Sequence, residues 1–337
     1  MKRLRVGLNG FGRIGRALTR IALTDDLFDI ALINTRKTQA EMMAYLLRYD
    51  SVYRTFAHDV RAEGNALKTN TQLIPTVQNA TIETIPWDDY GVDVVVDATG
   101  AYMTHEDLHK HLKGSVKKVL LTAPSKDDVI PHVVLGVNDR EFDFANHSII
   151  SNCSCTTNCA SPLLKVLHDS FRVVKGEITT IHAMTLTQSL LDDTGKSFDR
   201  ARAASQNIIP TTSGASKAVV KTIPALKGKL EVMSVRVPVP TVSMCDATVV
   251  VERSTDVDAV SAAFKIAADT QMKGILYHQH ETLVSSDYIG SPYSCIYDAN
   301  YTKVIDGNMV KVVAWYDNEW GYACRIADLV QRVGHFI

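Results

Sequence analysis

A glycine-rich turn near the N-terminus constrains the fold of this chain more than any other feature. The turn spans residues 10–15, follows a β-rich run at residues 5–8 directly and opens a helical segment at residues 13–24. Its first glycine permits a tight turn, its second lets backbone N–H groups approach a pyrophosphate, and its third lets the helix pack on the strand. The helix N-terminus adds partial positive charge. We favour dinucleotide binding over a turn that serves topology alone, with contacts from Asn9, Gly10, Phe11, Gly12, Arg13, Ile14 and Gly15.

The end of the second predicted strand bears on the choice of cofactor. In dinucleotide folds an acidic residue there usually binds the 2′-hydroxyl of the adenosine ribose. Here the strand at residues 30–33 is followed by Asn34, Thr35, Arg36 and Lys37, without a carboxylate. The repulsion against a 2′-phosphate is therefore removed, and Arg36 or Lys37 can pair with it, unless both are solvated turn residues. We hypothesise that the protein accepts NADP as well as, or better than, NAD.

Two styles of organisation follow one another along the chain. Before residue 155, short β-rich runs alternate with helical periodicity, which predicts an α/β, Rossmann-type, doubly wound and mostly parallel sheet. After it, longer β-rich runs predict an α+β domain whose long-stranded mixed or antiparallel sheet carries helices on one face. The predicted strands lie at residues 5–8, 30–33, 92–96, 118–121, 133–136, 148–150, 176–184, 231–239, 246–252 and 309–316, and the helices at 13–24, 39–48, 160–171, 216–223, 258–269 and 322–333.

Three cysteines lie close together where the first style gives way to the second. Cys155 falls at a helix N-terminus, where the dipole and free N–H groups stabilise a thiolate, and it is the candidate nucleophile. Cys153 and Cys159 are better explained as small buried residues, and we predict no metal, because no second pair completes a tetrahedral site. Six cysteines without a disulfide framework indicate reduced thiols. Among the 11 histidines, His182 ends a strong β run and is the candidate base.

The length and charge of the chain bound its organisation and its partners. A length of 337 residues exceeds what one core usually supports, so we predict a dinucleotide-binding domain at residues 1–154 and a catalytic domain at 155–317, with a helix at 318–337 packing back on the first. The 36 basic and 37 acidic residues leave no basic excess, which argues against nucleic-acid or anionic-membrane partners. Without a membrane-spanning or secretory segment, we expect a cytoplasmic protein.

Several motifs, taken in chain order, resemble phosphorylating glyceraldehyde-3-phosphate dehydrogenases. They are the glycine-rich turn, the Cys155 segment, His182, and residues 207–215, 236–238 and 315–319, and they run over essentially the whole chain. Several unrelated motifs in one order are more specific than any one alone. The resemblance implies a homotetramer that oxidises glyceraldehyde 3-phosphate with NAD or NADP and inorganic phosphate to 1,3-bisphosphoglycerate. Cys155 would carry the acyl group, and His182 would be its acid and base partner.

The resemblance also implies two anion sites and further cofactor contacts. Hydroxyls and guanidinium groups are suitable phosphate donors, although the hydroxyls taken singly fit capping and turn formation equally well. By this resemblance, the substrate phosphate would be bound by Thr185, Thr187 and Arg236. Inorganic phosphate would be bound by Ser154, Thr156, Ser213, Gly214 and Arg200, and Arg202 is an alternative to Arg200. On the cofactor, Asn318 meets the nicotinamide carboxamide and Tyr322 packs near the ring, while Thr99, Gly100 and Thr122 lie along it with Asn34, Thr35 and Arg36.

The chain departs from the family pattern in three places, and two alternatives stay open. Thr35 replaces a carboxylate, Met184 stands where the family often has tyrosine, and residues 192–199 are unusual for an intersubunit loop near the adenosine ribose. An erythrose-4-phosphate dehydrogenase shares the Cys/His pair but usually lacks the phosphate loop kept here as Ser213–Gly214. A non-catalytic dinucleotide-binding module is disfavoured by the intact pair and the neutral charge.

Overall fold

The computed structural model describes residues 3–195 and 197–337, which form two compact units. The first takes in the chain up to Val133, Glu141–Ser154 and Ala323–Ile337, and the second takes in Val134–Arg140 and Cys155–Tyr322. Lys196, within the unusual segment 192–199, lies outside the described residues.

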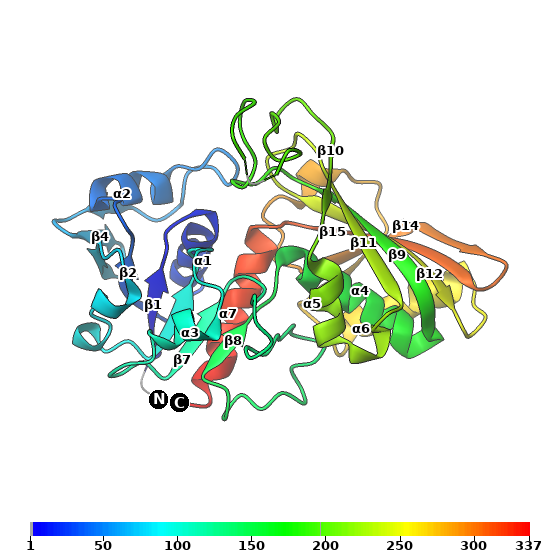
Figure 1. Cartoon of the computed structure of the whole chain (residues 1–337), viewed down its shortest axis with the longest axis horizontal. Coiled ribbons are helices and arrows are strands. Elements are labelled where there is room, and N and C mark those ends of the chain that lie inside the picture. Colours follow the sequence, from blue (N-terminus) through cyan, green and yellow to red (C-terminus); the bar gives the residue numbers. More distant parts are fainter. Residues whose placement is uncertain (1–2, 196) are drawn as a thin grey trace. The chain divides into compact units, whose positions relative to one another are not determined.

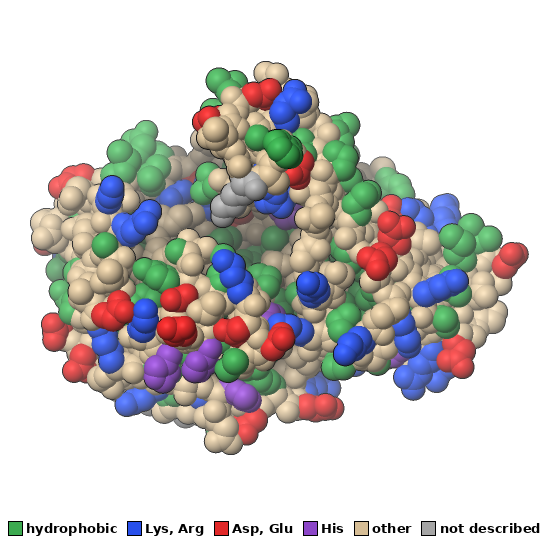
Figure 2. Space-filling model, viewed as in Figure 1, with side chains coloured by type: hydrophobic (Ala, Val, Ile, Leu, Met, Phe, Trp, Pro, Cys, Tyr) green, Lys and Arg blue, Asp and Glu red, His purple; other side chains and the backbone are tan. Residues whose placement is uncertain are grey.

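Across the described chain, every helix is too short or too polar to span a bilayer. Basic and acidic side chains are interspersed on the face seen in Figure 2.

The first unit contains an eight-stranded sheet of order β3-β4-β5-β2-β1-β6-β7-β8 (Figure 1). The strands from β5 to β8 in this order run parallel, and β3 and β4 add antiparallel pairs, so the predicted mostly parallel sheet is confirmed. Its elements are β1 (Arg5–Asn9), α1 (Arg13–Thr24), β2 (Asp29–Asn34), α2 (Ala40–Arg48), β3 (Val60–Ala62), β4 (Ala66–Thr69), β5 (Leu73–Val77), β6 (Val94–Asp97), α3 (His105–His109), β7 (Lys118–Leu121) and β8 (Ile149–Ser151).

The buried strands of this sheet explain why the sequence runs are so apolar. All residues of β6 and β7 are buried, as expected for strands covered on both faces. The last helix, α7 (Trp320–Gly334), lies mostly in the same unit and buries Ile326, Leu329, Val330 and Val333. Beyond the helix, the Phe336 ring stacks on Phe144 with centroids 5.6 Å apart.

The strand predicted at residues 133–136 is wrong. One isolated bridge, between His132 and Ser151, joins this segment to the sheet, and the chain then turns. Asn138 Oδ1 accepts the Val134 N–H, and Gly136 adopts a φ of +80°, which strand pairing does not allow. The apolar run is buried without being a strand, and periodicity alone cannot distinguish these two cases.

The second unit contains a seven-stranded mixed sheet of order β10-β11-β9-β12-β15-β14-β13. Helices α4, α5 and α6 cover one face of it (Figure 1), and β12 alternates buried and half-buried residues accordingly. The predicted sheet type is confirmed, although the short strands β10 and β13 and the strand β14 were not predicted. The elements are α4 (Cys155–Phe171), β9 (Val173–His182), β10 (Ile209–Thr212), α5 (Ala215–Thr222), β11 (Leu230–Arg236), β12 (Ser243–Val251), α6 (Val257–Asp269), β13 (Leu276–Gln279), β14 (Cys295–Ile305) and β15 (Met309–Tyr316).

The register of this sheet places four polar residues at one edge. Arg236 of β11 pairs with His182 of β9, and Ser243 of β12 pairs with Tyr316 of β15. The antiparallel pairing of β9 with β12, which puts Ile181 beside Met244, joins the two pairs. Arg236, His182, Ser243 and Tyr316 therefore form one row across four neighbouring strands, and we call this row the polar row.

A buried hydrogen-bonded network stabilises the first unit near the carboxyl ends of its strands. The Trp87 indole N–H donates to His111 Nδ1 at 3.0 Å, so the ring proton of a neutral His111 lies on Nε2. Nε2 faces Asp97 Oδ2 at 3.2 Å, and both side chains are fully buried. Asp97 also accepts a hydrogen bond from Asn9 and two from Thr99. His111 thereby satisfies two buried polar groups at once.

We expect His111→Leu to lower the free energy of unfolding by about 3 kcal/mol, because it leaves the Trp87 N–H without its buried acceptor and removes one of the two hydrogen bonds to Asp97 Oδ2. Urea unfolding followed by circular dichroism measures the effect. His109→Leu, at the exposed end of the helix α3 that precedes His111, is the matched control and should change stability by less than about 0.5 kcal/mol. Equal effects of the two substitutions would contradict the role given to His111.

Candidate active site

Cys155 begins helix α4 and faces the imidazole of His182. The thiol is half-buried, and its Sγ lies 3.6 Å from His182 Nε2. Helix α4 packs on strands of the second sheet, and this packing brings its first residue to the edge where β9 ends. The structure therefore joins the two residues that the sequence singled out as nucleophile and base, 27 positions apart in the chain.

The other ring nitrogen of His182, Nδ1, contacts a backbone carbonyl and a guanidinium group. Nδ1 lies 2.8 Å from the carbonyl oxygen of Ala183 and 2.7 Å from a guanidinium nitrogen of Arg236. The same guanidinium nitrogen donates to the Ala183 oxygen at 3.0 Å. The carbonyl oxygen can only accept from Nδ1, whereas the guanidinium can only donate to it, so the two contacts fix the plane of the ring and not the position of its proton. The ring is thus held with Nε2 toward Cys155.

Burial and positive charge set the protonation states of the pair. Burial, followed by the charges of Arg236 and Arg200, lowers the pKa of His182 to about 3. Burial raises the pKa of Cys155, while Arg236 and the N–H and hydroxyl of Thr156 act in the opposite direction. At neutral pH the imidazole is therefore uncharged, and it is a weak base while the charges of the guanidinium groups are uncompensated. An anion that binds the two guanidinium groups offsets their charge and raises the pKa of His182.

Two predicted phosphate-binding threonines lie together with Arg200. The hydroxyls of Thr185 and Thr187 are 2.8 Å apart, and Arg200 donates to Thr187 Oγ1 at 2.8 Å. Arg200 therefore contacts the group predicted for the substrate phosphate, although the sequence assigned it to the group for inorganic phosphate. Arg202, the alternative, is exposed and pairs with Asp192.

The residues predicted for inorganic phosphate are less closely gathered. Ser213 and Gly214 stand at the N-terminus of α5, where Ser213 Oγ accepts the Ala215 N–H at 3.2 Å. Thr156 is buried, and its hydroxyl lies 3.0 Å from Tyr316 Oη. Ser154 is half-buried just before α4. Hydroxyl and backbone groups near two helix N-termini are suitable for an anion, but each hydroxyl also serves the local structure.

The chain after β15 places Asn318 at the same edge of the sheet. Asp317 Oδ1 accepts the backbone N–H groups of Glu319 and Trp320 and so caps α7. Asn318 follows directly, is buried, and accepts a hydrogen bond from Ser243 at 3.1 Å. The predicted nicotinamide-binding asparagine is therefore fixed by the fold.

Two residues of the polar row had no role in the sequence-based site. The Tyr316 ring meets the His182 ring edge-on with centroids 6.1 Å apart, and burial raises the pKa of its phenol well above the ordinary value. Tyr316 belongs to segment 315–319, one of the motifs that resemble the family, so the sequence could have indicated it as a site residue. Ser243 lies in a run without any motif, and only the register reveals it.

The glycine-rich turn of the first unit leaves its backbone open to a ligand. Gly10 has a φ of +101°, and a Cβ there would lie 2.9 Å from backbone atoms of Ala98 and Thr99. A Cβ on Gly15 would lie 2.4 Å from the Gly10 oxygen, whereas one on Gly12 would meet nothing within 4 Å. Close packing requires glycine at the first and third positions, and the second exposes the start of α1, as pyrophosphate binding requires.

A cavity of about 170 Å³ lies beside this turn and gathers several predicted cofactor residues. Asn34 Nδ2 donates to Asn9 Oδ1 at 2.8 Å, and Thr35 Oγ1 donates to the Thr38 oxygen at 3.0 Å, so the lining is polar and firmly held. Arg36 is exposed at this cavity. The predicted residues that line it are Asn9, Gly10, Asn34, Thr35, Arg36 and Thr99. The open turn and the polar cavity fit a dinucleotide.

Other predicted cofactor residues do not line this cavity. Arg13 pairs with Asp50, and its guanidinium lies 5.5 Å from the centre of the Tyr53 ring. The Thr122 hydroxyl donates to the Asp97 carbonyl at 3.0 Å. The remaining ones are Phe11, which is buried; Ile14, which is half-buried; Gly100, which is exposed with a φ of +65°; and Tyr322, which is buried in the second unit.

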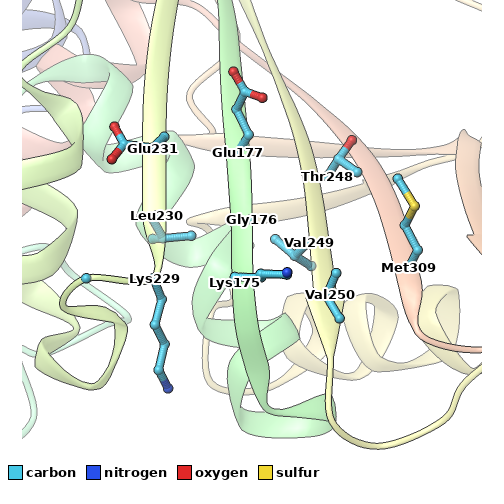
Figure 3. A pocket seen from close by; sticks show the side chains of 11 residues that line it. Lys175, Gly176, Glu177, Lys229, Leu230, Glu231, Thr248, Val249, Val250 and Met309 are labelled. Carbon is cyan, nitrogen blue, oxygen red and sulfur yellow. The ribbon is translucent and has the colours of Figure 1, made fainter.

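A larger cavity of about 390 Å³ lies on the second sheet, away from Cys155. Lys175 and Glu177 of β9 line it together with Thr248 and Met309 (Figure 3). These residues of β9 lie toward the opposite end of the strand from His182. Neither a cysteine nor a histidine is among its lining residues, so we do not place chemistry there.

Comparison with known proteins agrees with a dinucleotide site in the first unit and the Cys155/His182 pair in the second. Residues 4–105 match the NAD binding domain of glyceraldehyde 3-phosphate dehydrogenase, and residues 154–318 match the C-terminal domain of the same enzyme. The match to the NAD binding domain agrees with the dinucleotide fit of the glycine-rich turn.

Similarity to individual relatives extends over nearly the whole chain. Glyceraldehyde-3-phosphate dehydrogenase 1 of Bacillus cereus is 47% identical over 325 residues, which cover 96% of this chain and 97% of the relative. The enzyme of Geobacillus stearothermophilus is 47% identical over 98% of both chains, and that of Streptomyces coelicolor is 45% identical over 98% of this chain and 99% of its own. This chain belongs to the glyceraldehyde-3-phosphate dehydrogenase family.

Proposed function

We propose that the protein oxidises glyceraldehyde 3-phosphate in the presence of inorganic phosphate and releases 1,3-bisphosphoglycerate. The observation that carries this proposal is the 3.6 Å approach of Cys155 Sγ to His182 Nε2, beside a group of threonines and arginines suited to phosphate. The first unit would hold an NAD-type dinucleotide through its glycine-rich turn.

The chemistry assigned to Cys155 and His182 proceeds in two stages. In the first, the Cys155 sulfur forms a bond to the aldehyde carbon while the thiol proton passes to the carbonyl oxygen. His182 Nε2 then takes the proton of the resulting hydroxyl as the carbon loses hydride, which leaves a thioester. The dinucleotide supplies the acceptor for that hydride. In the second, inorganic phosphate attacks the thioester carbon and the carbon–sulfur bond breaks, so the thiolate of Cys155 is regenerated.

Two anion groups divide the phosphates of this reaction. Thr185, Thr187 and Arg236 would hold the phosphate of the substrate, and the contact of Arg200 with Thr187 leads us to add Arg200 to this group. Inorganic phosphate would fall to Ser154, Thr156, Ser213 and Gly214. Because Arg236 and Arg200 lower the pKa of His182, a bound dianion would bring the base closer to neutral pH, where proton transfer is most effective.

The proposed enzyme acts in the cytoplasm as a homotetramer. Exposed apolar side chains in the segment between β9 and β10 support association with further copies, because a monomer gains nothing from presenting them to water. They are Leu186, Leu190, Leu191, Phe198 and Ile208.

A steady-state assay with glyceraldehyde 3-phosphate, with and without inorganic phosphate, tests the proposed reaction. Turnover that requires phosphate is expected. Equal turnover without phosphate, or a preference for erythrose 4-phosphate, would favour an erythrose-4-phosphate dehydrogenase. Dinucleotide binding without turnover of either aldehyde would instead identify a non-catalytic module.

We expect Cys155→Ser to abolish aldehyde oxidation while leaving dinucleotide binding within about twofold, because an alcohol is a far weaker nucleophile than a thiolate. His182→Asn should lower kcat by about 10²- to 10⁴-fold, the usual contribution of a general base. Stopped-flow absorbance and calorimetric titration measure turnover and binding separately. Cys153→Ser, which alters a buried cysteine of the same segment, is the control; a comparable loss of turnover in this variant would count against a special role for Cys155.

We expect Arg236→Met to raise the pH midpoint of Cys155 alkylation by iodoacetamide by about one unit, because the positive charge that favours the thiolate is removed. His182 would not compensate, since burial remains the larger cause of its low pKa and keeps it neutral. Arg202→Met removes a nearby charge that does not act on Cys155 and should leave the midpoint in place. An unchanged or lower midpoint in Arg236→Met would contradict the coupling.

We also propose that the cofactor site accepts NADP. Thr35 directs its hydroxyl to Thr38 and supplies no carboxylate, and Arg36 forms no ion pair within residues 3–195 and 197–337. An exposed guanidinium at the cofactor cavity is a suitable partner for a 2′-phosphate.

Arg36→Met should lower kcat/KM for NADP by about tenfold and change that for NAD by less than about twofold, since only NADP carries the charged group. Lys37→Met is the matched control, because Lys37 does not line the cavity. Parallel steady-state assays with the two cofactors give the comparison. A wild-type enzyme with strong preference for NAD would dispose of the proposal.

A further inference from the structure

The hydroxyl of Ser243 connects two parts of the candidate site. Ser243 is 1% exposed and begins β12, between the strand that ends at His182 and the strand that ends at Tyr316. The Ala183 N–H donates to Ser243 Oγ at 3.1 Å. Ser243 Oγ lies 3.1 Å from Asn318 Oδ1. One buried side chain thus contacts the residue after the proposed base and the residue proposed to bind the nicotinamide.

The direction of these two hydrogen bonds fixes the orientation of the Asn318 amide. Because the Ala183 N–H already donates to Oγ, the hydroxyl proton of Ser243 remains to be satisfied, and the acceptor within reach is Asn318 Oδ1. A rotated amide would present an N–H to Oγ and leave the buried hydroxyl proton without this acceptor. Oδ1 therefore faces Ser243, and the NH₂ group faces away from it. Among the described residues, no hydrogen bond uses Asn318 Nδ2.

The Ala183 peptide links the same hydroxyl to the base. Its N–H is held by Ser243, and its carbonyl oxygen accepts from Arg236 and lies 2.8 Å from His182 Nδ1. A shift of Ser243 would therefore move the His182 ring that faces Cys155 as well as the Asn318 amide. The polar row makes this connection possible, since its register sets Ser243 beside the ends of both strands.

We propose that Ser243 is a positioning residue that selects which face of the nicotinamide ring meets the substrate. By holding Oδ1, it turns the Asn318 NH₂ group outward as a donor for the carboxamide oxygen of the cofactor, and so it disfavours the ring rotated by half a turn. This inference rests on the proposed function, which assigns Asn318 to the carboxamide. Ser243 acts in this role through its hydrogen bond to Asn318.

The test is a double-mutant cycle on the full chain with Ser243→Ala, Asn318→Ala and the double variant, using NAD as the probe. Calorimetric titration gives the Kd for NAD, and transfer from a substrate deuterated at the aldehyde carbon, read by NMR at nicotinamide C4, gives the stereospecificity of hydride transfer. Thr241→Val removes a neighbouring buried hydroxyl that donates to Asp317 instead of Asn318 and is the matched control. Thermal unfolding reports on the fold of each variant.

Ser243→Ala is expected to raise the Kd for NAD by about three- to tenfold and to place measurable deuterium on the opposite face of the ring, whereas Thr241→Val retains a single face. In the Asn318→Ala background, removal of the Ser243 hydroxyl should have no further effect on Kd, because both act through one contact. Additive effects, or retained stereospecificity in Ser243→Ala, would overturn the inference while leaving the proposed reaction intact. An unchanged Kd in Asn318→Ala would overturn the assignment of Asn318, and the inference with it. Phosphate-dependent turnover by the wild type tests the proposed reaction independently of both.

Discussion

The register of four neighbouring strands in the second sheet determines most of what the candidate site can do. It sets the side chains of Arg236, His182, Ser243 and Tyr316 in one row, although they come from segments far apart in the chain. A slip of one residue in any of these strands would send its member to the other face of the sheet. The alternating burial of β12 opposes such a slip, because it would expose the core side of the strand. The packing of the core therefore maintains the geometry of the chemistry.

Helix α4 completes this arrangement by bringing its N-terminus to the row. The Thr156 hydroxyl meets Tyr316, and Cys155 meets His182, so two consecutive residues of the helix contact two members of the row. Most of the remaining residues of α4 are buried, and the helix packs on β9, β12, β14 and β15, which limits its freedom to slide. A thiol held on a rigid element in this way keeps its distance to the imidazole, and such preorganisation is what the proposed acid–base catalysis requires.

The sequence was sufficient to predict much of the fold and the central pair of the site. The mostly parallel sheet follows from apolar runs alternating with helical segments, and Cys155 and His182 stand out because each ends or begins an element. The turn at residues 133–136 could not be distinguished from a strand, because burial makes both apolar. The contact of Arg200 with Thr187 and the position of Ser243 depend on loop geometry and strand register, which a single sequence does not encode in any local pattern.

The low pKa of His182 has a consequence for how substrates would be discriminated. An aldehyde without a phosphate group leaves the charges of Arg236 and Arg200 uncompensated, and the imidazole remains a poor proton acceptor. The phosphate of the proposed substrate would offset these charges, raise the pKa of His182 and so make it a better proton acceptor. Selectivity of this kind acts on the rate of the chemical step and does not require that the smaller aldehyde be excluded from the site. It would be lost gradually, and not abruptly, as salt screens the guanidinium groups.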